Sequence, residues 1–220
     1  MEEKIKFFVE KIKEIFGQRL KSCILYGSFV KGNYVKGMSD INLIVIVDNL
    51  NAADLEKISR NLSRFAYRNL IKPFFFSESF FLSSSDVFPV EWQDIKENHI
   101  VIAGDDLISR INIKSENLRI EIERKIKQLF LDFQHATIFE KDRFSIVKET
   151  VKNLRFLIPL IERQTGEKIN MPENLEKLIK AGRMRKGEIQ NTVDILIQFF
   201  LDIIQFIDHD FTKEKNEKIS

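Results

Sequence analysis

Residues 25–47, LYGSFVKGNYVKGMSDINLIVIV, contain two short motifs that lie between apolar runs. The first run ends at the Gly-Ser pair 27–28, and the second begins with SDIN at 39–42. A glycine has no Cβ, so a turn at this pair leaves room for a phosphate to approach the backbone and the serine hydroxyl. Because strand side chains alternate, Asp40 and Asn42 are expected to point to one face. The segment therefore predicts a strand, a turn and a second strand that opens with two oxygen ligands.

Helical patterns surround these two strands. Residues 1–16 and 52–70 carry apolar side chains at helical spacing, whereas 22–26 and 41–47 are short apolar runs typical of strands. Residues 71–95 contain Pro73 and Pro89, which favour edge or strand-start positions because proline cannot donate a backbone hydrogen bond. We therefore expect two more strands in residues 71–95.

The second half of the chain has only helical patterns. Apolar residues repeat at helical spacing in 118–133, 144–161 and 189–208. Pro159 lies inside the second of these helices and is expected to bend or end it. The third helix is apolar around most of its circumference, which predicts a central position or a partner, and a homodimer is one expectation for the chain.

These patterns predict an α+β fold. The expected division is an α/β domain with a mixed sheet flanked by helices at 1–110 and an all-α helical bundle at 111–220, both of ordinary domain size. The charged segment TKEKNEKIS, 212–220, has too little apolar surface to hold itself in place and is expected to fray.

The composition narrows the expected ligands and location. Lys and Arg number 35 against 33 Asp and Glu, so the formal net charge of +2 gives no strong field for a polyanion. The 20 phenylalanines are interleaved with few basic residues, which disfavours nucleic acid as the main ligand. Cys23 is the single cysteine and lies in an apolar run, as expected for a packed thiol in the cytoplasm. No segment has the pattern of a signal peptide or a membrane span.

Together, GSFVKG and SDIN resemble nucleotidyltransferases of the DNA polymerase β type, especially the small antibiotic nucleotidyltransferase-like branch with a C-terminal helical domain. In that superfamily a Gly-Ser pair at a helix start precedes Ser-Asp-x-Asp on the next strand, and a third carboxylate lies on a later strand. Residues 25–47 match this pattern except at Asn42, where the family has its second Asp.

The resemblance implies roles for individual residues. Gly27, Ser28 and Ser39 would bind the nucleotide, which would be a nucleoside triphosphate. Asp40 would be catalytic and would hold the Mg²⁺ that accompanies the triphosphate, because Mg²⁺ prefers oxygen ligands. Asn42 would be a further metal ligand through its carbonyl, with one negative charge fewer than an Asp and therefore a lower metal affinity.

The third carboxylate of the pattern is expected to be Glu91. In FPVEWQDI, 88–95, Glu91 lies between two apolar residues and fits that strand position better than Asp94 or Asp86. It would then bind metal and help to deprotonate the acceptor hydroxyl. An exposed acid on an edge strand remains the alternative interpretation of Glu91.

Two hypotheses of function follow. The first is a protein that binds Mg-nucleoside triphosphate and transfers a nucleoside monophosphate to the hydroxyl of an acceptor that the sequence does not identify. The second, motivated by Asn42, is a non-catalytic, degenerate member of the same fold that acts as a regulatory or antitoxin-like interaction protein. Whether the chain is an enzyme is left open at this point.

Overall fold

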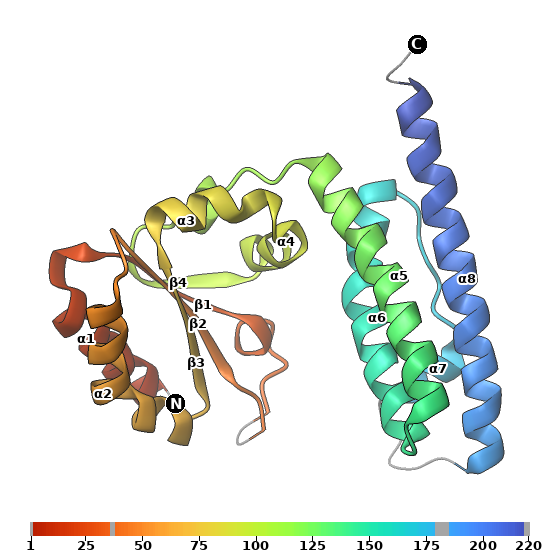
Figure 1. The fold of residues 1–220 in the computed structure, drawn as a ribbon, viewed down its shortest axis with the longest axis horizontal. Helices are drawn as coiled ribbons and strands as arrows, with labels where there is room; N and C mark the ends of the chain where they lie inside the picture. Colours follow the sequence, from red (N-terminus) through yellow and green to blue (C-terminus); the bar gives the residue numbers. More distant parts are fainter. Residues whose placement is uncertain (1, 36–37, 179–184, 218–220) are drawn as a thin grey trace. The chain divides into compact units, whose positions relative to one another are not determined.

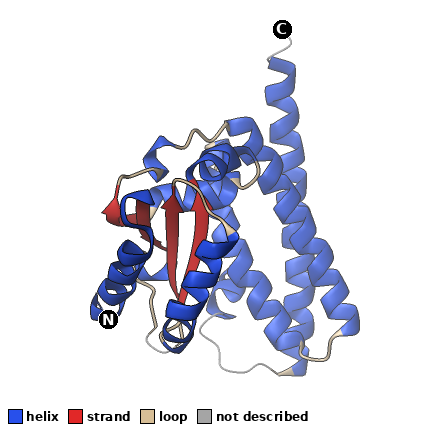
Figure 2. Ribbon diagram, turned by 60° about the vertical axis from the view of Figure 1, so that its left-hand side comes forward, coloured by secondary structure: helices blue, strands red, loops and turns tan. Residues whose placement is uncertain are grey.

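The computed structural model describes residues 2–35, 38–178 and 185–217. The chain divides into two compact units, Met1–Lys114 and Ser115–Ser220. The first contains a mixed sheet flanked by helices, and the second contains only helices within the described residues (Figures 1 and 2). The predicted α+β fold class is confirmed.

The first unit is built on a sheet that has four strands within the described residues, in the order β3-β2-β1-β4. The strands are β1 (Leu20–Tyr26), β2 (Ile41–Val47), β3 (Ile71–Ser77) and β4 (His99–Gly104). Strand β1 runs antiparallel to β2 and β4, whereas β2 and β3 are parallel. The predicted strand at 41–47 is confirmed residue for residue.

Helices cover both faces of this sheet. One face packs against α1 (Glu2–Phe16) and α2 (Ala52–Arg68), and the other against α3 (Glu78–Ser83) and α4 (Pro89–Glu97). Figure 1 shows the two helix pairs on opposite sides of the strands. Short 3-10 turns complete the unit: η1 (Gly17–Arg19), η2 (Gly27–Phe29), η3 (Ser84–Asp86) and η4 (Ile108–Arg110).

Alternation along β2 assigns its side chains to two layers. Leu43 and Val45 are buried in the α1–α2 layer, and Ile44 and Ile46 are buried in the α3–α4 layer. A strand that is buried on both faces has a continuous apolar sequence, which explains the run LIVIV. By the same alternation, Asn42 points to the α3–α4 side of the sheet.

The structure corrects part of the prediction for residues 71–95. The first part forms β3, and Pro73 lies on this edge strand as expected. The second part was expected to be a strand and is helix α4, so that Pro89 and Glu91 are both helical. Proline suits the first turn of a helix because its missing N–H would have no intrahelical partner there, and an acid in that turn suits the helix dipole. The fourth strand is β4, which lies after this segment.

The long helices of the second unit are α5 (Ser115–Phe139), α6 (Arg143–Thr165) and α8 (Lys186–Glu217), with the short α7 (Glu173–Leu178) between the last two. They pack against one another, as Figure 1 shows. Helix α6, which was expected to bend or end at Pro159, does not end there and continues to Thr165. It ends where Gly166 takes a left-handed conformation, with φ at +75°.

Helix α8 finds its apolar partners within its own unit. The ring of Phe200 lies 5.0 Å from that of Phe130 and 5.9 Å from that of Phe133, both on α5. Phe200 is buried. Packing inside the unit therefore covers much of the apolar surface that suggested a homodimer.

The end of the chain differs from the sequence expectation. Helix α8 includes residues 212–217 of the charged segment that was expected to fray, and residues 218–220 lie outside the described part of the chain. Among the described helices, none combines the length and the apolar character that a membrane crossing requires.

Candidate functional site

Four polar side chains form a row across one end of the sheet. The strand register pairs Lys72 with Asn42, Asn42 with Tyr26, and Tyr26 with His99. Residues paired across strands point to the same face, so the four members of this cross-strand row lie on the α3–α4 side. The next residue of β2 on this face, Ile44, is buried, whereas every member of the row keeps exposed surface. This end of the sheet is therefore polar and accessible.

The Gly27 turn begins directly after β1 and contacts the cross-strand row. Gly27 has a φ of +81°, and its carbonyl accepts hydrogen bonds from the backbone N–H groups of Val30 and Lys31, both at 3.1 Å. A Cβ on Gly27 would lie 2.9 Å from the amide nitrogen Nδ2 of Asn42, too close for a normal contact. The left-handed backbone therefore favours glycine here, and a Cβ would also require the end of the flexible Asn42 side chain to shift.

The Gly-Ser pair opens a short 3-10 turn, η2, and not the longer helix of the resembled family. Ser28 lies in this turn and is partly exposed, and its carbonyl accepts a hydrogen bond from Asn33 N–H at 3.0 Å. The structure thus places Gly27, with Ser28 next to it in the chain, beside Asn42 at the start of β2.

Ser39 and Asp40 lie just before β2. The Ser39 hydroxyl oxygen accepts a hydrogen bond from Val35 N–H at 3.0 Å, and Ser39 N–H donates to the Val35 carbonyl at 2.8 Å. These two bonds hold the chain as it enters the strand. Asp40 then precedes Ile41, the first residue of β2, and its side chain is about one-third exposed, at 31%.

The Asp40 carboxylate is paired with a lysine that the sequence patterns did not identify. Lys72 Nζ lies 2.6 Å from Asp40 Oδ2, and the Lys72 side chain is 65% exposed. Lys72 lies on β3 and is also the residue in register with Asn42. The polar start of β2 therefore faces a cation supplied by the neighbouring strand of the same chain.

Glu91 lies on α4, not on a strand of the sheet, which corrects the position expected from the sequence. It occupies the first helical turn and is partly buried, with its Oε2 atom enclosed. One turn later, Asp94 forms an ion pair with Lys31 at 2.5 Å. This ion pair ties the helix that carries Glu91 to the residues that follow the Gly27 turn.

The strand next to β2 thus presents Lys72, and not an acid, beside Asn42. Sequence reasoning missed this residue because the parallel pairing of β2 with β3 is a non-local property that no short motif encodes. The one available signal was that Lys72 is the only charged residue in IKPFFFS, the strand segment 71–77.

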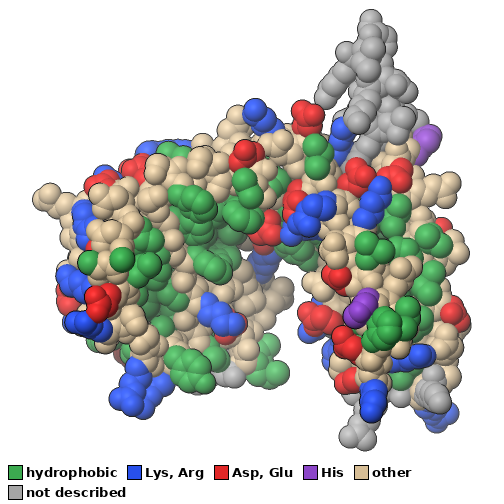
Figure 3. All heavy atoms as spheres, in the orientation of Figure 1, with side chains coloured by type: hydrophobic (Ala, Val, Ile, Leu, Met, Phe, Trp, Pro, Cys, Tyr) green, Lys and Arg blue, Asp and Glu red, His purple; other side chains and the backbone are tan. Residues whose placement is uncertain are grey.

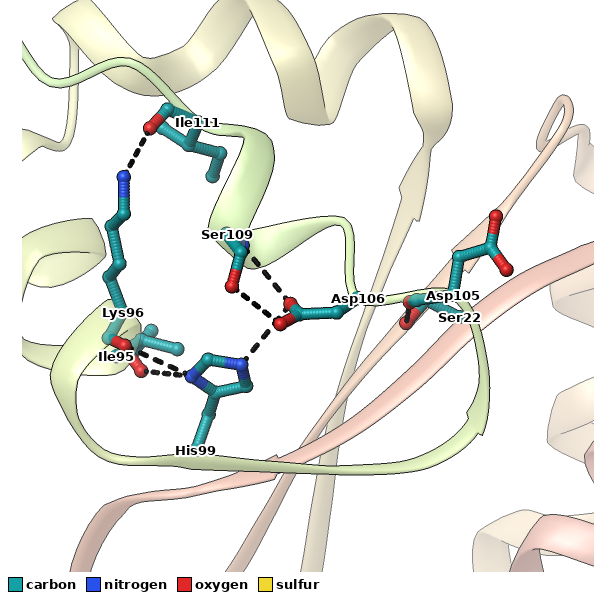
Figure 4. A network of polar contacts seen from close by, with 8 residues as sticks. All are labelled: Ser22, Ile95, Lys96, His99, Asp105, Asp106, Ser109 and Ile111. Atoms are coloured by element: carbon teal, nitrogen blue, oxygen red, sulfur yellow. Dashed lines mark hydrogen bonds and ion pairs between the residues drawn. The ribbon is translucent and has the colours of Figure 1, made fainter.

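Around His99 the hydrogen bonds serve to hold the fold together (Figure 4). Its Nδ1 lies 3.0 Å from the Ile95 carbonyl oxygen, and its Nε2 lies 3.2 Å from Asp106 Oδ1. Ser109 donates to Asp106 through both its backbone N–H and its hydroxyl. Because the hydroxyl is bonded to the carboxylate and not to the imidazole, these residues do not form a histidine-activated nucleophile.

Two groups in this region, Tyr26 and Asp106, have shifted pKa values. Burial raises the pKa of the Tyr26 hydroxyl, so Tyr26 is a neutral hydrogen-bond donor at neutral pH. Burial alone would raise the pKa of Asp106, but the hydrogen bonds from Ser109 and the neighbouring His99 outweigh that effect and leave the pKa lowered. Asp106 is therefore ionised at neutral pH, and its hydrogen bonds connect His99 on β4 with Ser109 on the turn η4.

The residues at this site do not fit a centre that holds two divalent metal ions. Two-metal phosphoryl transfer needs several carboxylates that converge on the ions. Among the described residues, no group of three or more His, Cys, Asp or Glu side chains converges in this way. Asp40 is paired with Lys72, Asn42 carries no charge, and Glu91 lies on a helix.

Comparison with known proteins agrees with the motifs and the fold. A family model described as a nucleotidyltransferase domain matches residues 6–178. The crystal structure of spectinomycin adenyltransferase AAD(9) from Enterococcus faecialis with ATP and spectinomycin has a similar fold, with a TM-score of 0.57 and 14% sequence identity over 91% of this chain and 99% of that chain. A search of curated proteins gave no match. Since the family model spans well over half of its residues, this chain belongs to the nucleotidyltransferase domain family.

Proposed function

We propose that this chain binds a nucleoside triphosphate at the Gly27 turn, on the face of the sheet that carries Asn42 and Lys72. The observation that carries this proposal is the close approach of the Asn42 side chain to Gly27, which joins the turn to the start of β2. The glycine exposes backbone, Ser28 adds a hydroxyl, and the side chains opposite are donors of hydrogen bonds to phosphate oxygens.

Transfer of the nucleoside monophosphate is proposed to be weak or absent. The reaction would join an acceptor hydroxyl oxygen to the α-phosphorus and break the bond from that phosphorus to the pyrophosphate leaving group. A family site catalyses this step with acids that hold Mg²⁺ and accept the hydroxyl proton. Here Asp40 is the one carboxylate at the start of β2, and Lys72 already neutralises it.

The sequence pattern assigns Mg²⁺ to this site, as the ion that a triphosphate carries in solution. Asp40 and the carbonyl of Asn42 would be its protein ligands, and Mg²⁺ commonly needs only one or two of these because phosphates and water complete its shell. To bind there, the ion would have to displace the ammonium of Lys72. The acceptor, a hydroxyl compound, is not specified by any residue of this site.

A second candidate is a non-catalytic member of the family that acts through binding a partner, in a regulatory or antitoxin-like role. The observation that favours it is the combination of Asn42 and Lys72 at positions where transfer chemistry calls for acids. In this case a bound triphosphate would stabilise the first unit without being consumed. The two candidates share the binding step and differ in whether pyrophosphate is released.

Isothermal titration with ATP, in the full chain, tests the binding step. ATP is the first probe because the structurally similar adenyltransferase was crystallised with it. Gly27→Ala is expected to weaken ATP binding by about tenfold or more, because its Cβ would push Asn42 away and would strain the turn. Ser28→Ala, which keeps the backbone, is expected to weaken binding by about threefold to tenfold through loss of one hydrogen bond.

Gly166→Ala is the matched control for backbone strain. Gly166 has a φ of +75°, close to that of Gly27, but a Cβ there meets open space in the second unit. It should lower the melting temperature slightly and leave ATP affinity unchanged. Wild-type affinity in both Gly27→Ala and Ser28→Ala, with intact circular dichroism spectra, would remove the Gly27 turn as the binding site.

A further inference from the structure

We propose that the ammonium of Lys72 is the resident cation of this site and contacts the triphosphate directly, so that this chain binds nucleotide without a divalent metal. The inference rests on the proposed nucleotide binding at the Gly27 turn. It identifies the Lys72 ammonium as the positive charge that makes binding of the triphosphate favourable. It reassigns to a side chain of β3 the role that the sequence pattern gave to Mg²⁺.

Strand register places Lys72 near the Gly27 turn. It is in register with Asn42 on the adjacent parallel strand, and neighbouring strands lie about 4.8 Å apart. Asn42 in turn contacts the backbone at Gly27. An anion on the Gly27 turn therefore lies within reach of a flexible lysine side chain on β3, with Asn42 between them.

The site has no excess negative charge among Asp40, Asn42 and Lys72. A group of carboxylates repels a triphosphate until metal ions neutralise it, so such a site depends on divalent metal. Asp40 and Lys72 together are neutral, and Asn42 adds no charge. The amide N–H₂ of Asn42 and the N–H₃⁺ of Lys72 are donors that match phosphate oxygens, whereas two carboxylates would be acceptors only. Without an excess of acid, nothing here draws a divalent ion strongly.

The ion pair between Lys72 and Asp40 is partly exposed to solvent. The Lys72 side chain is 65% exposed and Asp40 is 31% exposed. An exposed ion pair is held weakly, so the ammonium can exchange Asp40 for a phosphate at little cost. An ammonium has three N–H donors, so it can also keep Asp40 while it binds a phosphate oxygen.

Titration calorimetry with two probes, ATP and inorganic tripolyphosphate, tests the inference in the full chain. Each probe is titrated once in EDTA and once in excess Mg²⁺. Wild-type affinity for each probe is expected to differ by less than about threefold between the two conditions. Tripolyphosphate separates the phosphate contacts from any contact with the nucleobase.

Lys72→Met is expected to lose about tenfold or more of the affinity in EDTA, since one charge-assisted contact is removed, and to regain most of it in Mg²⁺. Lys6→Met, an exposed lysine on α1, is the matched control and should leave both affinities unchanged. Thermal melting of each variant checks that the fold is intact.

Asp40→Asn separates the two mechanisms by the sign of its effect. If Lys72 is the resident cation, removing the opposing carboxylate leaves affinity in EDTA equal or several-fold higher. If Asp40 holds a required metal, affinity in Mg²⁺ falls sharply. The double variant Asn42→Asp, Lys72→Glu restores acids to the row and is expected to bind Mn²⁺, measured by its electron paramagnetic resonance signal, where the wild type does not.

The outcomes distinguish this inference from the proposed function. Wild-type binding that requires Mg²⁺, together with unchanged binding in Lys72→Met, would overturn the role of Lys72 and leave the nucleotide site in place. Absence of binding of either probe to the wild type in both conditions would overturn both proposals.

Discussion

Lys72 on β3 and Asp40 at the entry to β2 form an ion pair with 2.6 Å between Nζ and Oδ2. Because Lys72 is also in register with Asn42, both polar positions at the start of β2 neighbour the same lysine residue. A nucleotidyltransferase site would use these positions to collect metal ions. In this chain they lie beside a lysine, which has direct consequences for catalysis.

Restoring one acid is not expected to restore transfer. Asn42→Asp adds a carboxylate at the family position but leaves Lys72 beside it, so a second metal ion still meets a cation. With ATP labelled at the α-phosphate, pyrophosphate release by Asn42→Asp should stay close to the wild-type background. The double variant Asn42→Asp, Lys72→Glu should exceed both. Turnover by the wild type equal to that of the double variant would show that the natural site is already competent.

Attachment of α4 to the Gly27 turn is expected to depend on Lys31 and Asp94. Their ion pair, at 2.5 Å and with both side chains less than one-third exposed, links the turn to the helix that carries Glu91. Asp94→Asn should increase amide hydrogen exchange in residues 27–31 and in α4 while the rest of the sheet keeps its protection. The exposed Asp86→Asn, on the neighbouring η3 turn, is the matched control and should change neither segment.

The acid stability of the first unit should include a contribution from Asp54. The hydrogen bond from the Arg19 side chain, opposed in part by burial and assisted by the Asn51 N–H, lowers the pKa of Asp54. A carboxyl whose folded pKa is lowered stabilises the fold above its unfolded pKa, about 3.9, and loses this contribution as pH falls through the folded value.

Urea denaturation from pH 7 to pH 3 measures this contribution. The free energy of unfolding of the wild type should exceed that of Asp54→Asn at neutral pH, and the difference should shrink below about pH 4. Asp48→Asn, which removes a more exposed carboxylate from its ion pair with Lys21, serves as the comparison and should show a smaller difference. A difference between wild type and Asp54→Asn that is constant over the whole range would contradict the linkage.

The stability of the α3–α4 layer is expected to depend on the indole N–H of Trp92 as well as on the size of the Trp92 ring. Its Nε1–H donates to the Ser84 carbonyl at 3.1 Å, and the side chain is buried among aromatic rings. Trp92→Phe keeps an aromatic ring but removes the donor and some volume, so it should cost roughly 2–4 kcal/mol of unfolding free energy. Chemical denaturation followed by circular dichroism measures this, and the exposed Tyr67→Phe should cost less than about 0.5 kcal/mol.

Several features were predictable because they are local. The apolar run of β2 is buried on both faces, so its sequence alone marked a strand at 41–47, and Gly27 showed where the preceding strand must turn. Helix α4 was misread because Glu91 between two apolar residues imitates strand alternation. In fact Pro89 opens a helical turn, and the register of a helix buries Val90 and Trp92.

The charge of the site could not be predicted from local sequence, because it depends on which strands pair. Asn42 could be recognised as unusual from its motif, but Lys72 lies thirty residues later and becomes part of the site only through the parallel pairing of β2 with β3. Motif spacing identifies residues that are close in sequence, whereas strand register brings together residues that are not.

A crystal structure of the full chain with Mg²⁺ and a non-hydrolysable ATP analogue tests the central claim most directly. The account predicts triphosphate oxygens at the Gly27 turn, Lys72 Nζ within about 3 Å of one of them, and no metal ion bound to Asp40. An octahedral Mg²⁺ on Asp40 and the phosphates, with Lys72 turned away into solvent, would contradict it.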